Sequence, residues 1–308
     1  FYNIGGTALV VVAVSMIVVI GFLAAKEING PPSTTPPPYI TPNPEDPCEI
    51  SIKDLRDLSE SLVSRDVNNV ANKIIVKYNS TRLLEVGSSV LTGPTIAALM
   101  PLYDNYKAHV GEDDDWNEQQ TAEKDAFLDA IMDTKVMQFT ELWMNDRCLL
   151  NDTDLRSVLD EAWFTGYAGS HSGGDAVDSS GFEHTFLGQL MDDRVLGFNN
   201  WIFYSHEQQA ETVKYNEGDF INSTQIGEGD TNKGEIVKLN FLWQDLPTSG
   251  TTMFIGTSPE LELALYTVCF RLMPGKHCPL QMKKKQFELL TMDYQNKGVI
   301  SVAKPIFN

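Results

Sequence analysis

The order of its sequence patterns predicts that this chain folds as an α+β protein, with a helical region first and a β-rich region second. Apolar residues recur at helical spacing through residues 54–164, and short β-branched and aromatic runs separated by turn residues begin at residue 182. Because these helices and strands are not interleaved, the pattern favours α+β over alternating α/β. One long apolar stretch ahead of both regions predicts an N-terminal transmembrane helix.

The apolar stretch at residues 6–25 predicts a membrane anchor. It contains 20 residues and no charge, and a helix of about 20 residues spans the roughly 30 Å hydrocarbon layer of a lipid bilayer. We therefore expect residues 1–27 to act as a signal-anchor. A cleaved secretory signal peptide is the alternative, because Ala24 and Ala25 weakly resemble a small-residue cleavage site.

Residues 28–47 contain eight prolines, and this composition predicts an extended stalk. Proline fixes φ and lacks an N–H donor, so neither a helix nor a sheet can form across such a stretch. Recognition of the stalk by a proline-binding module is a weaker alternative. The chain thus divides into the anchor at 1–27, the stalk at 28–47 and a folded domain at 48–308, whose helical part is 48–165 and whose β-rich part is 166–308.

Within the folded domain, the helical period covers residues 50–67, 94–110, 121–147 and 155–164, with capping residues at 151–154. Strands are expected at residues 184–190, 195–204, 235–243, 251–257, 266–273, 287–294 and 299–307, with one helix at 259–266 between them. The acidic segment 111–120 is interpreted as a solvated loop, because its spacing is not that of a calcium-binding EF-hand loop.

Four cysteines follow the predicted anchor, and an even number favours disulfides. Cys269 and Cys278 flank the turn-like segment FRLMPGKH, so a local bridge between them is geometrically easy. Cys48 and Cys148 would then clamp the start of the folded domain. Four reduced thiols in the core are the alternative.

Three N-glycosylation sequons also follow the anchor, at Asn79, Asn151 and Asn222. Each triplet is common by chance, but together with the cysteines they favour a glycoprotein. We expect a single-pass type II membrane protein whose C-terminal domain is lumenal or extracellular.

The formal net charge of −19, from 23 basic and 42 acidic residues, disfavours a nucleic-acid partner. Phosphate binding usually requires a basic surface, because the protein must neutralise the backbone. One small basic pocket could still exist in such a chain. RNA is therefore not the expected partner.

Several ordered motifs in the β-rich part resemble the EndoU family of uridylate-specific endoribonucleases. They are DSSGFEH at 178–184, LGFNNWIFY at 196–204, FIGTSPELELALYTVCF at 254–270 followed by PGKHC, and a tail with LTMDYQ and VISVAKPIF at 290–307. The resemblance covers roughly residues 50–308 and implies antiparallel β-sheets of the EndoU type.

The resemblance implies RNA cleavage by transesterification, in which the ribose 2′-OH attacks its own phosphorus and leaves a 2′,3′-cyclic phosphate. Two histidines suit the required base and acid, because imidazole titrates near neutrality. A lysine stabilises the developing phosphoryl charge, and an aromatic residue stacks on the uracil. The family's manganese dependence carries over no ligand set, so we expect no cofactor, or manganese if the protein is active.

Only one of the three catalytic positions implied by the resemblance keeps its residue. His184 matches the family's first histidine, whereas the second histidine falls at Asn199, whose amide cannot exchange a proton near neutral pH. Counting back from Phe254 in FIGTSP, the family's lysine aligns with Thr248. His184 also fits a hydrogen-bonded framework histidine.

Two further positions differ from the family pattern. Gln189 stands where the family has a glutamate after the first histidine, and Lys304 stands where it has a tyrosine near the end of the chain. The resemblance thus implies that the base-stacking residue is missing. It leaves Glu183 and Lys304 as candidate substrate contacts.

Three other residues could replace the lost groups. His206 lies seven residues beyond Asn199, and an odd offset on a continuous strand points to the opposite face, so it could serve only beyond a bulge or turn. Lys238 is expected to face solvent on its strand, and His171 to be a plain residue of a Gly/Ser-rich loop.

We therefore expect a catalytically impaired pseudoenzyme that is anchored in a lipid bilayer and acts as a structural or binding subunit beside other membrane-protein subunits. Loss of a general acid or base lowers a rate by roughly 10² to 10⁴. The alternatives are an active endoribonuclease with a relocated base and lysine, and an RNA-binding module without catalysis.

Overall fold

A computed structural model describes residues 48–112, 116–169 and 177–307. The predicted anchor and stalk lie outside the described residues, as does His171. None of the helices in the described ranges has the length and apolar character needed to cross a bilayer. The folded domain is α+β, and the strand pairs of its sheets are antiparallel.

Each of the four predicted helical segments contains at least one helix. The helices of this part are α1 (Ile52–Arg65), α2 (Ser88–Leu91), α3 (Pro94–Leu99), α4 (Glu118–Met132), α5 (Lys135–Asp146) and α6 (Leu155–Leu159). The Thr134 side chain accepts a hydrogen bond from the Met137 amide and so starts α5 as a separate helix. A hairpin of β1 (Ile74–Val76) and β2 (Leu84–Val86), which the helical period did not predict, lies between α1 and α2.

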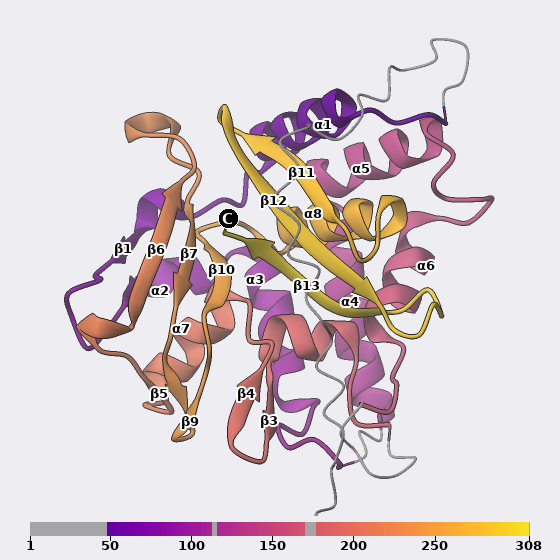
Figure 1. Ribbon diagram of the computed structural model, residues 1–308. Coiled ribbons are helices and arrows are strands. Elements are labelled where there is room, and N and C mark those ends of the chain that lie inside the picture. The colour runs from indigo at the N-terminus through magenta and orange to yellow at the C-terminus, as the bar shows by residue number, and fades with distance from the viewer. Residues whose placement is uncertain (1–47, 113–115, 170–176, 308) are drawn as a thin grey trace, which may run out of the picture. The chain divides into compact units, whose positions relative to one another are not determined.

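Two three-stranded sheets dominate the second part and lie side by side (Figure 1). The first has the order β10 (Thr251–Ile255), β7 (Glu235–Leu239) and β6 (Phe220–Gln225). The second has the order β11 (His277–Met282), β12 (Lys285–Asp293) and β13 (Ile300–Ile306). Strands β10 and β13 meet at the seam between the sheets. Smaller sheets pair β3 (Gln189–Met191) with β4 (Arg194–Leu196), and β5 (Val213–Lys214) with β8 (Leu242–Trp243) and β9 (Leu246–Pro247).

Three of the predicted strands are wrong in whole or in part. The segment 184–190 is mostly a π-helical turn, η4 (Glu183–Leu187), followed by β3. The segment 195–204 leaves β4 and enters helix α7 (Trp201–Gln209). The segment 266–273 is the second half of helix α8 (Pro259–Leu272), which extends well past its predicted end.

The last two errors share one physical cause, which is the burial of α7 and α8 on almost every side. A helix without a polar face cannot be separated from a buried strand by periodicity alone. The local signal that decides the matter is a cap. The Asn200 side chain accepts hydrogen bonds from the Ile202 and Phe203 amides at 3.0 and 3.1 Å, and this starts α7.

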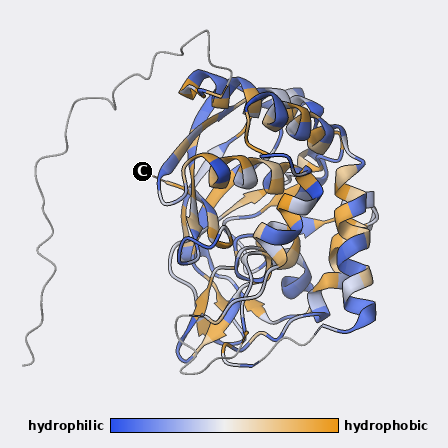
Figure 2. Cartoon of the chain, turned by 90° about the vertical axis from the view of Figure 1, so that its right-hand side faces the viewer, coloured by the Kyte–Doolittle hydropathy of each residue, from blue (hydrophilic) through white to orange (hydrophobic). Residues whose placement is uncertain are grey.

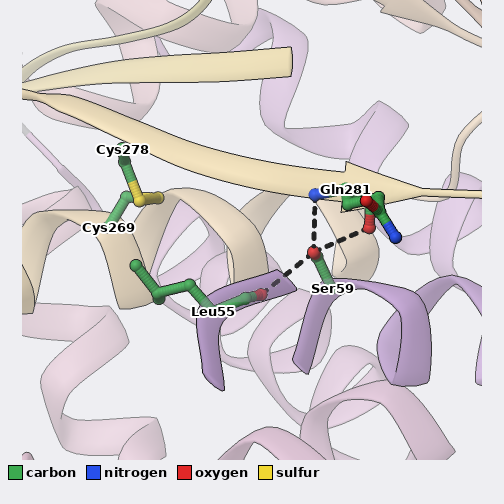
Figure 3. Close-up of a disulfide and its surroundings, with 5 residues drawn as sticks. All are labelled: Leu55, Ser59, Cys269, Cys278 and Gln281. Atoms are coloured by element: carbon green, nitrogen blue, oxygen red, sulfur yellow. Dashed lines mark hydrogen bonds between the residues drawn. A yellow bond between two sulfur atoms is a disulfide. The ribbon is translucent and has the colours of Figure 1, made fainter. Parts of the chain in front are cut away.

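Helix α1 is fastened to β11 across a long stretch of sequence (Figure 3). The Ser59 hydroxyl hydrogen-bonds with both backbone groups of Gln281, with the nitrogen at 3.0 Å and the oxygen at 2.8 Å. Close by, the predicted disulfide between Cys269 and Cys278 joins α8 to β11. The helices carry hydrophobic and hydrophilic residues in alternation along their length (Figure 2), as expected for elements that bury one face.

The second predicted disulfide, between Cys48 and Cys148, ties the first described residue to the end of α5. Its two cysteines are 100 residues apart in the sequence. In the chain-entropy account, closing so long a loop in the unfolded state stabilises the fold by about 4 to 5 kcal/mol.

Candidate active site

His184 lies on η4, against the C-terminal strand β13. The turn is set up by Ser180, whose hydroxyl accepts the Glu183 amide at 3.1 Å and whose carbonyl accepts the His184 amide at 3.0 Å. Gly188, with φ +86°, ends the turn in a conformation that favours glycine. The motif around His184 therefore fixes its backbone before any ligand is considered.

Gly197 allows the next segment to lie directly against His184. A Cβ at this position would stand 1.7 Å from the His184 carbonyl oxygen and 3.0 Å from the ring carbon Cδ2, and the φ of Gly197 is +66°. The close approach lets the amide of Phe198 donate to the His184 carbonyl at 3.1 Å, and that of Asn199 to the Thr185 carbonyl at 2.7 Å. Residue 199 is thereby held beside η4.

The Asn199 side chain is buried and supports the edge of a sheet. Its Nδ2 donates to the carbonyl of Thr252 on β10 at 2.7 Å, and the neighbouring Asn200 forms a bridge with Phe254 of the same strand. Asn199 thus satisfies a backbone group on the edge of β10 that faces away from β7. An amide used in this way holds structure and transfers no proton.

Thr248 is also buried, and its hydroxyl closes a turn. The oxygen accepts the Phe241 amide at 2.9 Å and donates to the Phe241 carbonyl at 3.1 Å. This residue therefore supplies no positive charge at the position that the resemblance assigns to a lysine.

The pKa of His184 is lowered to about 4, chiefly by burial; a hydrogen bond with Gln189 opposes this shift, and the positive charge of Lys304 adds to it. The ring is therefore neutral at physiological pH. The neutral ring is a weak base, and it carries no imidazolium proton that it could donate to a leaving group. The groups that shift its pKa include no second imidazole.

Gln189 and Glu183 belong to a buried hydrogen-bond network. Nε2 of Gln189 donates to the Asp178 carbonyl at 2.8 Å and to Oε1 of Glu183 at 3.3 Å, and Oε1 of Gln189 accepts from the Ser179 hydroxyl at 3.0 Å. Glu183, predicted as a substrate contact, is only 1% exposed. It borders a 270 Å³ cavity that is also lined by Tyr106, Trp116, Lys124 and Phe164.

Two other histidines have carboxylate partners of their own. His206 lies on helix α7 and not on a strand, so the predicted face argument does not apply; its Nδ1 is 3.0 Å from Oε1 of Glu207. His277 on β11 contacts Glu288 at 2.8 Å. It is separated from Lys304 by the intervening strand β12, which places their backbones roughly 10 Å apart.

Lys238 is half-buried on β7 rather than facing solvent as predicted. Its Cε lies 3.1 Å from the position that a Cβ on Gly250 would take. The roles of Gly197 and Thr252 were also missed. A glycine within the LGFNN motif was a usable signal for the first, whereas nothing local marks Thr252. Within the described ranges, no group of three or more His, Cys, Asp or Glu side chains could hold a metal ion.

The fold and the motif-built turn around His184 define a domain of the endoribonuclease type. The family model described as Endoribonuclease XendoU matches residues 54–305, and this chain belongs to that family.

Among its relatives, the uridylate-specific endoribonuclease of Homo sapiens is 29% identical over 252 residues, which cover 76% of this chain and 59% of that protein. The Mus musculus protein of the same name is 30% identical over 253 residues, with the same coverage. The chain thus spans about three fifths of the length of these relatives. A solved structure titled "The structure of XendoU: a splicing independent snoRNA processing endoribonuclease" superposes with a TM-score of 0.69 at 24% identity, covering 82% of this chain and 96% of that one, which is a likeness of fold.

Proposed function

We propose that this protein is a catalytically impaired member of its family. It binds a ligand or a partner and does not cut RNA efficiently. One observation carries the proposal. Asn199 and Thr248, which the motif resemblance aligns with a proton-transferring residue and a cation, are both buried and hydrogen-bonded to backbone groups. Loss of a general acid or base lowers the rate roughly 10² to 10⁴-fold, and losses within one catalytic unit are not additive.

The test is a cleavage assay on the full chain in detergent micelles, with a uridine-containing oligonucleotide, in the presence and absence of manganese. The human relative serves as the positive control. We expect cleavage at least 10²-fold slower than the control. Cleavage at a comparable rate that is abolished by His184→Ala would overturn the proposal.

An active endoribonuclease remains the second candidate, favoured by the survival of His184 beside Lys304. The double reversion Asn199→His with Thr248→Lys separates the two. Under our proposal the reverted protein gains cleavage and a requirement for His184. If the natural chain is already active, the reversion adds little.

We further propose that the folded domain is lumenal or extracellular, on a type II membrane anchor. Two formed disulfides support this, with no free cysteine in the part of the chain that the structure describes. The sequon residues Asn79, Asn151 and Asn222 are all exposed. Electrophoretic shifts on treatment with a glycosidase and with a reductant are expected; the absence of both would contradict this placement. Cross-linking in intact membranes would then identify partner subunits.

A further inference from the structure

The lysine missing from position 248 has a candidate replacement on a neighbouring strand. In the register of β7 with β10, Lys238 lies directly opposite Thr252. Directly opposite residues of an antiparallel pair project from the same face of the sheet. The Lys238 side chain therefore shares a face with that of Thr252.

That face is turned toward the second sheet. The Thr252 hydroxyl donates to the carbonyl of Pro305 on β13 at 2.6 Å. Farther along the same face, the ring of Phe254 lies 5.8 Å from that of Phe287 on β12. Lys238 thus lies one strand away from the seam, on the sheet face whose edge meets the end of β13, where Lys304 directly precedes Pro305.

The Lys238 side chain extends along the sheet toward the loop that holds Thr248. Its Cε rests against Gly250, 3.1 Å from where a Cβ would be, and Gly250 is two residues from Thr248. A side chain at position 250 would obstruct this path. The missing side chain of Gly250 therefore leaves room for the lysine to bring its ammonium group toward the place expected for the family's cation.

Neither Lys238 nor Lys304 forms an ion pair with any residue that the structure describes. Other lysines of this acidic chain do, such as Lys124 with Asp160 and Lys214 with Asp245. Lys304 lies close enough to His184 for its charge to lower the pKa of the imidazole. Unpaired ammonium groups attract an anion, and a phosphate group accepts charge-assisted hydrogen bonds from lysine.

We propose that Lys238 supplies the positive charge that residue 248 lacks, and that with Lys304 it forms a site for the phosphate group of a nucleotide. This inference rests on the proposed function, in that the site is used for binding after its proton-transfer pair is lost.

Calorimetric titration of the full chain in detergent micelles at low salt tests the site. The probes are inorganic phosphate, uridine 3′-monophosphate and a short oligouridylate. Lys238→Ala and Lys304→Ala are each expected to weaken binding of the monophosphate about tenfold. Lys284→Ala, at an exposed lysine of the β11–β12 turn, is the matched control and should leave the affinity unchanged. Lys238→Arg should restore most of it.

The three probes also distinguish between the possible sources of the phosphate group. Binding of the oligouridylate that is tighter than that of the monophosphate assigns the site to an RNA chain, and equal binding assigns it to a single nucleotide. The inference is overturned if the natural protein binds none of the three probes, or if Lys238→Ala behaves like Lys284→Ala. These outcomes are independent of the cleavage assay, which alone decides the proposed function.

Discussion

Two neighbouring asparagines face two different regions of the molecule. Asn199 points to the seam between the sheets and binds the Thr252 carbonyl, whereas Asn200 caps α7 and donates at 3.4 Å to Glu262 at the start of α8. Burial shifts the titrating group of each region in opposite directions. It lowers the pKa of His184 to about 4 and raises that of Glu262 to about 8.

Both shifts keep a buried group neutral at physiological pH. In the seam region the turn of η4 and the segment at Asn199 are held together by backbone hydrogen bonds, and His184 is neutral there, as Glu262 is within α8. The comparison teaches that geometry and proton chemistry are separable in this fold.

Gly197→Ala should disrupt the packing of residue 197 against His184 in the seam region. The added Cβ would overlap the His184 carbonyl oxygen at 1.7 Å, and a φ of +66° is already unfavourable for alanine. We expect a loss of about 5 kcal/mol in the free energy of unfolding, measured by chemical denaturation. Gly218→Ala is the matched control, because its Cβ would meet open space. Equal stability of the two variants would contradict the close approach.

The buried carboxyl groups of Glu262 and Asp66 should make the protein less stable as the pH rises. The pKa of Glu262 is raised to about 8 and that of Asp66 to about 6, chiefly by burial, so the stability they contribute in acid is lost as pH rises through these values. Tyr103 and Tyr266 also face Glu262. Thermal unfolding should show a loss of about 3 kcal/mol between pH 6 and pH 9, most of it from Glu262. Glu262→Gln should flatten this profile, and a profile unchanged by that variant would refute the assignment.

The seam region should give the opposite pH dependence. The folded pKa of His184 lies below its ordinary value of 6.5, so stability present above that value is lost as pH falls toward 4. Up to about 3 kcal/mol is expected from this group. His184→Asn should reduce the acid loss and leave the alkaline loss intact. If His184→Asn changes the acid and alkaline losses of stability equally, the two regions are not independent.

Asn199→Ala should destabilise the fold by about 1 to 2 kcal/mol, because it leaves the Thr252 carbonyl without its donor. Asn200→Ala provides the comparison, since loss of an N-cap costs about 1 kcal/mol. Urea denaturation of both variants measures the difference. If Asn199→Ala is neutral, Asn199 is not a structural residue, and its role at the seam must be sought in binding.

The motif around His184, the Cys269–Cys278 disulfide and the helix-then-strand order could be predicted because each leaves a local mark, although the turn at this motif was expected to be a strand. The Cys48–Cys148 disulfide was predicted only because these two cysteines remain once the other two are paired. His184 sits in a motif, and Cys269 and Cys278 flank a short turn. The helix α7 was missed because WIFY is apolar throughout, so only the cap at Asn200 distinguishes it from a strand. Lys238 was misplaced for a different reason. Its surroundings are set by the register of β7 with β10 and by the bare backbone of Gly250, neither of which can be read locally.

The register of β6 with β7 places one more group on the lysine's face of the sheet. Asn222 lies directly opposite Lys238, is exposed, and begins the third sequon. An oligosaccharide attached there would overhang the ammonium group from the side away from the seam. If the sequon is used, carbohydrate would therefore restrict access to Lys238 from that side.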